Sequence, residues 1–145
     1  MLGPDFKEFV RLLNAHNARY LVVGGYAVAV HGYPRFTKDL DIWVEPSEQN
    51  SLRTLDALND FGFASLGITQ KDLLDENSVI QLGRPPYRID ILTSLSGVDF
   101  ATCYEARILI DLDGIEVSFI DVEHLITNKR STGRSQDLAD VENLE

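Results

Sequence analysis

The 145-residue sequence predicts one α/β (α+β) domain, residues 1–145, in which a mixed, mainly antiparallel sheet is flanked by helices. Short apolar runs that end at glycine, proline or aspartate predict strands, and they alternate with longer segments whose apolar residues recur at helical spacing. Two pairs of strands are separated only by a turn, which predicts hairpins. The length and the 44% apolar share are sufficient for one hydrophobic core.

The first element expected is a helix over residues 4–17. Pro4 is favourable in the first turn of a helix. Phe6, Phe9 and Leu13 recur at helical spacing, which predicts a buried stripe. We expect this helix to support the first strand and to carry no chemistry.

Residues 20–45 form the stretch around which the rest of the chain is organised. The apolar run 21–23 predicts a buried strand that ends at Gly24 and Gly25, and residues 26–31 predict a short helix. Glycines allow the backbone to turn tightly and to approach a ligand. The free N–H groups at the start of the helix favour a phosphate.

The next strand carries two aspartates. Alternation places Asp39, Asp41 and Trp43 on one face and the apolar residues between them on the other. Aspartate is depleted in strands, and two neighbouring carboxylates repel each other by roughly 4 kcal/mol at an effective dielectric constant near 20. Because a divalent cation removes this repulsion and Mg²⁺ prefers oxygen ligands, the pattern predicts a magnesium site.

Two helices are expected after this strand. Ser47 predicts the cap of a helix that runs to about residue 60, with Leu52, Leu55 and Leu58 facing inward. A short helix is expected over residues 69–74. Neither helix carries residues that indicate chemistry.

Two strands are then expected, over residues 78–82 and 87–92. Asp90 lies in the second strand between apolar neighbours, and a buried aspartate needs a partner. Three nearby residues are expected only at the rim of a site: Arg84, Tyr87 and Arg88.

A second hairpin is predicted over residues 107–112 and 115–120, because Asp113 and Gly114 between apolar runs are a strong hairpin signal. Asp113 and Asp111 are therefore interpreted as turn and edge residues, although they are, like Asp90, aspartates beside apolar residues. Two further helices are expected to follow, from residues 121 and 135.

Three residues that often carry chemistry are expected in structural roles here. Trp43 shares the face of the aspartates and either packs in the core or stacks on a base, with the core role favoured. Cys103, in a predicted helix, is interpreted as a core residue, and His31 as a packed histidine at a helix end.

The order of these motifs resembles the nucleotidyltransferase superfamily of the polymerase-β type. Its pattern is a strand, Gly-Gly or Gly-Ser, a short helix, and Asp-x-Asp on the next strand. The form GG…RFTKDLDIWV is most similar to small bacterial nucleotidyltransferase-like proteins related to the AbiEii toxins. The minimal antitoxin nucleotidyltransferases usually carry a Gly-Ser, an Ala-Arg-Gly helix and a Ser-Asp loop, and these elements are absent. The segment HLITNKRSTGRSQDLADVENL resembles the closing segment of the same family.

The resemblance implies specific roles. Asp39 and Asp41 would bind two Mg²⁺ ions, with Mn²⁺ as an alternative, while Asp90 would bind the catalytic metal and help to deprotonate the acceptor. The residues expected to bind the nucleotide are Gly24, Gly25, Arg35, Thr37, Lys38 and Lys129. Arg35, Thr37 and Lys38 also have ordinary interpretations as loop cations and a strand cap. Arg134 and Asp137 are expected to form a structural ion pair.

Composition narrows the partners. A net charge of −10 argues against broad nucleic-acid binding. No apolar run approaches the ~20 residues that span a bilayer, no secretory signal begins the sequence, and a single cysteine is typical of the cytosol. We therefore expect a cytoplasmic protein without membrane contact. The expected partners are an NTP, an acceptor hydroxyl on a protein, tRNA or small molecule, and either a second copy or a cognate toxin or antitoxin.

Four alternatives remain open at this point. The first is a catalytically silent module of the same fold, against which three intact aspartates argue. The second is a toxin or antitoxin that differs only in its acceptor. The third is a structural Ca²⁺ site, although such sites usually gather their ligands on a loop. The fourth is a small-molecule transferase, similar to enzymes that adenylylate aminoglycosides, in which a dimer completes the pocket.

Overall fold

A computed structural model describes residues 3–33, 37–84 and 87–145. The described strands form one sheet: β1 (Tyr20–Val23), β2 (Asp39–Val44), β3 (Val79–Arg84), β4 (Tyr87–Leu92), β5 (Ile108–Leu112) and β6 (Ile115–Phe119). Their spatial order is β3-β4-β2-β1-β6-β5. The β1–β2, β3–β4 and β5–β6 pairs are antiparallel, whereas β2–β4 and β1–β6 are parallel. The prediction of a mixed, mainly antiparallel sheet is confirmed.

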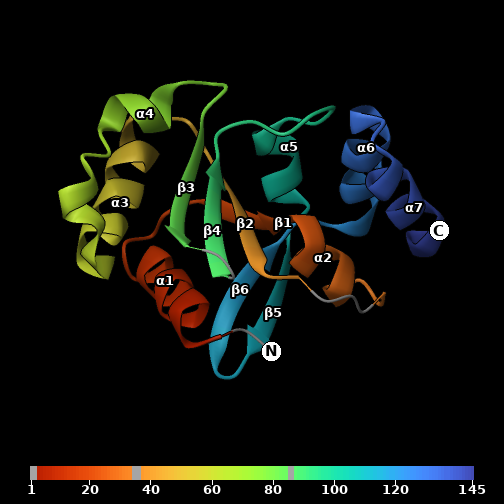
Figure 1. Ribbon diagram of the computed structural model, residues 1–145, viewed down its shortest axis with the longest axis horizontal. Helices are drawn as coiled ribbons and strands as arrows, with labels where there is room; N and C mark the ends of the chain where they lie inside the picture. Colours follow the sequence, from red (N-terminus) through yellow and green to blue (C-terminus); the bar gives the residue numbers. More distant parts are fainter. Residues whose placement is uncertain (1–2, 34–36, 85–86) are drawn as a thin grey trace.

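Helices lie on both sides of the strands (Figure 1). They are α1 (Pro4–Ala15), α2 (Gly24–Val30), α3 (Glu48–Leu58), α4 (Gln70–Leu74), α5 (Phe100–Glu105), α6 (Val122–Thr132) and α7 (Ser135–Leu144), with short irregular turns η1 (Asn59–Phe63) and η2 (Ala64–Leu66) after α3. In Figure 1, α1, α3 and α4 lie to the left of the strands, and α2, α5, α6 and α7 lie to the right. No helix in the described part of the chain has the length and apolar character needed to cross a lipid bilayer.

The predicted buried stripe of α1 is confirmed, because Phe6, Phe9 and Leu13 lie in the core. Phe9 meets Phe61 of η1 edge to face, with 5.3 Å between the ring centroids. Such contacts add to the stabilisation that burial of aromatic rings provides. Helix α1 thus packs into the core through its apolar stripe and contacts η1.

The inward face of α3 differs from the prediction. Leu52 is 48% exposed, whereas Leu58 is buried and Leu55 is partly buried. Asn50 takes an inward position, where its side chain accepts a hydrogen bond from the Arg19 amide at 2.6 Å and donates to the Glu45 carbonyl at 2.9 Å. The helix face follows these polar contacts at the strand ends rather than the leucine spacing, because unpaired backbone groups are costly to bury.

The second hairpin is confirmed. Asp113 (φ 54°) and Gly114 (φ 86°) both have positive φ, as the two central residues of a type I′ turn require. Asp111 accepts a hydrogen bond of 2.8 Å from the Gly114 amide. Asp113 is therefore a turn residue and Asp111 lies in the edge strand β5, as expected, and both are far in the sheet order from β2 and β4.

Candidate active site

The parallel pairing of β2 with β4 brings the predicted carboxylates together. In this register Asp39 pairs with Arg88, and Asp41 pairs with Asp90. Residues two apart in a strand share a face, and paired residues of neighbouring strands point to the same side of the sheet. The three aspartates and Arg88 therefore lie side by side on one face at the middle of the sheet.

Arg88 bridges two of these carboxylates. Its Nε lies 2.8 Å from Asp90 Oδ1 and its Nη2 lies 3.1 Å from Asp90 Oδ2, which is a two-pronged ion pair. The same Nη2 lies 3.3 Å from Asp39 Oδ2. The sequence interpretation placed Arg88 only at the rim, although its spacing of two residues from Asp90 in YRIDIL already assigned it to the same strand face.

Asp41 carries the strongest electrostatic signal of the three carboxylates. Burial, together with the negative charges of Asp90 and Asp39, raises its pKa from 3.8 to about 7, while the positive charges of Lys129 and Arg88 oppose the rise. A carboxylate whose pKa is raised by burial and by neighbouring negative charges lies in a site that favours a cation.

Gly24 and Gly25 allow β2 and the loop before it to lie close to α2, because neither glycine has a side chain. A Cβ atom on Gly24, which has φ +67°, would lie 2.1 Å from Asp41 Oδ2, and a Cβ atom on Gly25 would lie 2.9 Å from Thr37 Oγ1. Helix α2 begins at these glycines, two residues earlier than the sequence predicted. The observed function of the pair is thus to make room for Asp41 and Thr37, and nucleotide binding by Gly24 and Gly25 stays a prediction.

The loop before β2 is described in part. The hydroxyl of Thr37 donates to the Asp39 carbonyl at 3.2 Å, which fits the interpretation of Thr37 as a strand cap. The side chain of Lys38 is exposed. Arg35 lies outside the described residues. Phosphate binding by these three residues stays a prediction.

Lys129 lies in a buried ion cluster formed by α6 and α7. Its Nζ is 3.0 Å from Asp137 Oδ1 and 3.0 Å from Asp140 Oδ2, and the three side chains are 5%, 9% and 1% exposed. Arg134 Nε lies 2.8 Å from Asp137 Oδ2, so the predicted Arg134–Asp137 pair is present. Because two carboxylates already neutralise Lys129, its predicted contact with phosphate would compete with this cluster.

The remaining candidates have structural roles. Trp43 is 2% exposed and packs edge to face against Phe100 of α5, with 5.1 Å between the ring centroids. The ring of His31 lies 2.7 Å from the Ile120 carbonyl through Nε2. Cys103 is fully buried, and burial raises the pKa of its thiol to about 12. These placements confirm the interpretation of all three as packing residues.

No group of three or more His, Cys, Asp or Glu side chains in the described ranges is arranged to hold a metal ion. The donor set of Asp39, Asp41 and Asp90 nevertheless fits a hard divalent cation by its chemistry, because it supplies carboxylate oxygens from two adjacent strands. In this arrangement Arg88 contacts both Asp39 and Asp90.

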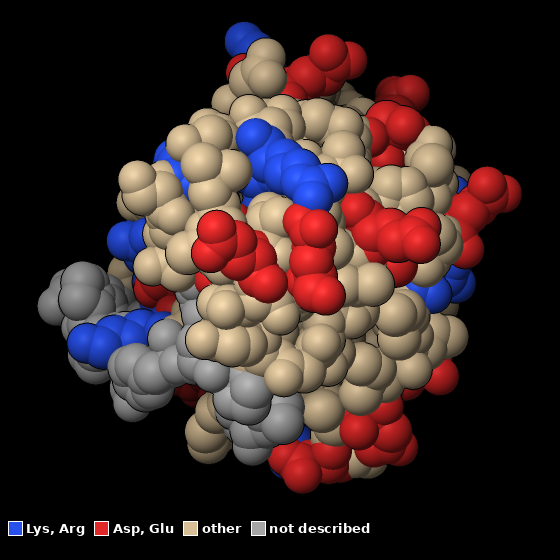
Figure 2. Space-filling model, turned by 90° about the vertical axis from the view of Figure 1, so that its right-hand side faces the viewer, with Lys and Arg blue, Asp and Glu red and all other residues tan. Residues whose placement is uncertain are grey.

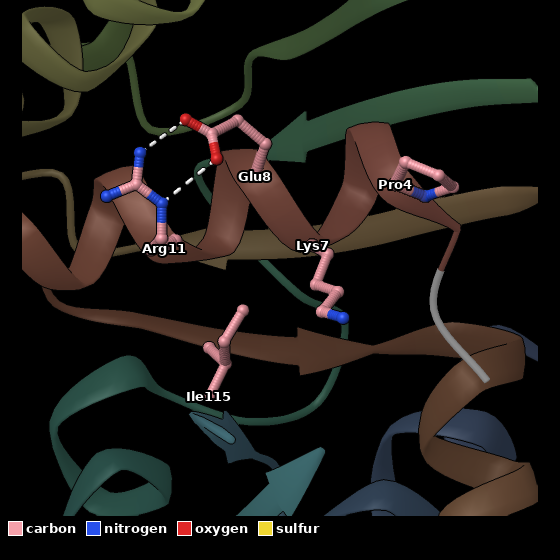
Figure 3. A pocket seen from close by; sticks show the side chains of 5 residues that line it. All are labelled: Pro4, Lys7, Glu8, Arg11 and Ile115. Carbon is pink, nitrogen blue, oxygen red and sulfur yellow. Dashed lines mark hydrogen bonds and ion pairs between the residues drawn. The ribbon is translucent and has the colours of Figure 1, made fainter. Parts of the chain in front are cut away.

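The surface gives two further observations. The side of the molecule that carries α6 and α7 displays acidic side chains without a continuous basic patch (Figure 2). A shallow groove at the other end of the fold is lined by Pro4, Lys7, Glu8, Arg11 and Ile115 (Figure 3). None of these groove residues was predicted for the site, and Glu8 and Arg11 pair with each other there.

Solved structures with the same fold include an adenylyltransferase and proteins described as nucleotidyltransferases or nucleotidyltransferase-like. A Thermotoga maritima protein assigned as a nucleotidyltransferase matches with a TM-score of 0.64 and 13% identity, covering 99% of this chain and 94% of that one. The lincomycin-bound lincosamide antibiotic adenylyltransferase LnuA matches with a TM-score of 0.61 and 16% identity, over 99% and 96% of the two chains. An antigenic nucleotidyltransferase-like protein from Paracoccidioides brasiliensis matches with a TM-score of 0.52 and 16% identity, over 96% and 75%.

Sequence comparison assigns the family. No curated protein matches the chain. A family model described as "nucleotidyltransferase of unknown function (DUF6036)" matches residues 5–145, which is nearly the whole chain. The predicted nucleotidyltransferase fold is thereby confirmed, and the chain belongs to the DUF6036 family of nucleotidyltransferases.

Proposed function

We propose that this protein transfers a nucleoside monophosphate from an NTP to an acceptor hydroxyl, with Asp39, Asp41 and Asp90 as the catalytic carboxylates. One observation carries the proposal: Asp41 stands opposite Asp90 in the β2–β4 ladder, beside Asp39, and its pKa is raised to about 7. Ionised carboxylates on adjacent strands are costly unless a cation accompanies them. The family assignment supports this class of reaction.

The three aspartates would hold two Mg²⁺ ions, with Mn²⁺ as an alternative. When bound, such cations supply positive charge that stabilises the attacking and leaving oxygens of an in-line displacement. Asp39 and Asp41 come from one strand and Asp90 from its neighbour, so the donors approach from two directions.

The reaction makes one bond and breaks one. The acceptor oxygen forms a bond to the α-phosphorus, the bond from that phosphorus to the oxygen bridging it to the β-phosphate breaks, and pyrophosphate leaves. The proton of the acceptor hydroxyl passes to the carboxylate of Asp90, which acts as the general base. Gly24, Gly25, Thr37, Lys38, Arg35 and Lys129 are proposed to position the triphosphate.

The acceptor is proposed to be a small molecule, a protein or tRNA. The lincosamide adenylyltransferase among the structural neighbours acts on a small molecule, which supports the first class. The net charge of −10 and the acidic surface in Figure 2 argue against extended contact with RNA. A role in a toxin–antitoxin or phage-defence system, with a cognate protein partner or a second copy, belongs to the same proposal.

The test is incubation with each α-³²P-NTP and Mg²⁺ or Mn²⁺ against small hydroxyl compounds, lysate proteins and tRNA. We expect one acceptor to be labelled by wild-type protein and not by Asp41→Asn. The matched control is Asp113→Asn, because Asp113 is an exposed aspartate in the β5–β6 turn. Equal labelling by Asp41→Asn would remove the metal assignment, and absence of any labelled acceptor would contradict transfer.

A second candidate is a catalytically silent module that binds nucleotide. The observation that favours it is the engagement of Asp39 and Asp90 by Arg88, which gives both carboxylates a contact with a cation of the chain itself. Thermal-shift measurements with the four NTPs separate the two candidates. A silent module would be stabilised by an NTP and would label no acceptor.

A further inference from the structure

Arg88 occupies the oxygens that the proposed metal site requires. Its guanidinium contacts both oxygens of Asp90, at 2.8 and 3.1 Å, and Oδ2 of Asp39 at 3.3 Å. We propose that Arg88 is an internal counter-cation that competes with a divalent cation for Asp39 and Asp90, so that metal binding requires displacement of the guanidinium. This inference rests on the proposed function, because it concerns the same carboxylates.

The geometry makes the two cations alternatives. A two-pronged Arg–carboxylate pair directs both oxygens of the carboxylate toward the guanidinium. A metal ligated by Asp90 and Asp39 would approach the same oxygens, and a guanidinium beside it would add repulsion between like charges. The register of β2 and β4 places Asp41 opposite Asp90 and Asp39 opposite Arg88, so one guanidinium reaches carboxylates of both strands.

The exposure of the groups shows that the guanidinium is able to leave. Arg88 is 31% exposed and Asp39 is 40% exposed, so both retain contact with water, while Asp90 is 11% exposed. When the Arg88–Asp90 ion pair breaks, the guanidinium of Arg88 therefore keeps contact with water. An ion pair between partly exposed groups, such as Arg88 and Asp39, contributes little net free energy.

The test is Mn²⁺ titration without nucleotide, followed by the electron paramagnetic resonance signal of free Mn²⁺ and by calorimetry. We expect Arg88→Gln to bind Mn²⁺ at least about tenfold more tightly than wild type, which corresponds to about 1.4 kcal/mol. Arg88→Lys, which keeps one charge but loses the two-pronged geometry, should lie between them. Arg11→Gln is the matched control, because Arg11 makes a similar two-pronged pair with Glu8 on α1 (Figure 3), and it should leave Mn²⁺ affinity unchanged.

Equal or weaker Mn²⁺ binding by Arg88→Gln overturns the competition and makes Arg88 a residue that orients Asp90. Circular dichroism establishes that each variant is folded, and if Arg88→Gln does not fold, Arg88→Lys decides by the same criterion. The two proposals fail separately. If Arg88→Gln binds Mn²⁺ more tightly than wild type but no acceptor is labelled, only the proposed transfer reaction is contradicted. If wild type labels an acceptor but Arg88→Gln has unchanged Mn²⁺ affinity, only the proposed competition is contradicted. Failure of every form to bind Mn²⁺, with or without NTP, would contradict both.

Discussion

Two cations in this protein each hold two carboxylates, in opposite surroundings. Lys129 lies 3.0 Å from both Asp137 and Asp140, and all three side chains are at most 9% exposed. Arg88 contacts Asp90 and Asp39 at similar distances but is itself 31% exposed. We call the buried group of Lys129, Asp137 and Asp140 the closed cluster and the partly exposed group of Arg88, Asp39 and Asp90 the open cluster.

The comparison separates structural charges from exchangeable ones. Leaving a buried charge without its partner is costly, so the Lys129 cluster is fixed once the chain has folded. The Arg88 cluster is in contact with water and can change partners at small cost. The contrast also suggests which cluster is suited to ligand exchange: the one on the sheet, beside Asp41.

The largest expected effect comes from breaking the closed cluster. Lys129→Met would remove the buried cation that contacts Asp140 and one of the two cations that contact Asp137, and should lower the free energy of unfolding by about 3–5 kcal/mol. Urea denaturation measures this. Lys7→Met is the control, because Lys7 is 36% exposed and pairs with Asp113 only at 3.7 Å. A loss for Lys129→Met as small as that of the control would mean that the two clusters do not differ.

The second effect is an opposite pH dependence of the two clusters. Asp41 has a raised pKa, so between about pH 4 and about pH 7 the folded state binds the proton more tightly, and stability falls as pH rises. The displacement from 3.8 to about 7 corresponds to at most about 4 kcal/mol. Burial alone would raise the pKa of Asp137, but hydrogen bonds from Thr132 and Lys129 lower it, so its contribution is present above about pH 4 and is lost in acid.

Melting temperatures with EDTA across this pH range test the signs. Asp41→Asn should flatten the decline between weakly acidic and neutral pH, whereas Asp137→Asn should alter the profile only in acid. If the melting temperature of Asp41→Asn falls with pH as steeply as that of wild type, ionisation of Asp41 does not destabilise the folded state and the prediction is wrong.

The third effect concerns the packing of Asp41, which lies beside the open cluster, against Gly24 of α2. Gly24→Ala should cost about 1–3 kcal/mol, because Gly24 has φ +67° and the new methyl group would meet Asp41. Gly114→Ala has a similar φ of +86° but open space around it, so it isolates the backbone cost. Urea denaturation of both variants gives the difference. Equal losses would mean that Asp41 moves freely away from α2.

The smallest effect on stability is expected for the open cluster itself. Arg88→Gln should lower the free energy of unfolding by less than Lys129→Met does, because Arg88 and Asp39 are 31% and 40% exposed, whereas only Asp90, at 11%, is nearly buried. The same urea measurement applies, with Arg11→Gln as its counterpart on α1. A loss near that of Lys129→Met would instead make Arg88 a structural residue.

Local patterns in the sequence were sufficient for most of the fold. The glycine pair, the alternating aspartates and the Asp113–Gly114 turn each act over a few residues, and the elements that they predict are present. The inward face of α3 was missed at Leu52, because the contacts of Asn50 with Arg19 and Glu45 depend on where two strands end. Such long-range contacts leave no periodic signal.

In the candidate site, too, the residues with a local signal were predicted and the long-range contacts were not. Asp39, Asp41 and Asp90 were identified because acids are unusual in apolar strands. The bridge from Arg88 to Asp39 joins residues 49 positions apart and depends on the parallel register of β2 and β4. The neutralisation of Lys129 likewise depends on the way α7 folds back onto α6.

The position of the closed cluster in the chain has a consequence for folding during synthesis. Asp137 and Asp140 belong to α7, which leaves the ribosome after all strands of the sheet (Figure 1). Until then the ammonium of Lys129 lacks these two acids, and its burial without them is unfavourable. Nascent chains should therefore keep α6 undocked until α7 emerges and supplies Asp137 and Asp140.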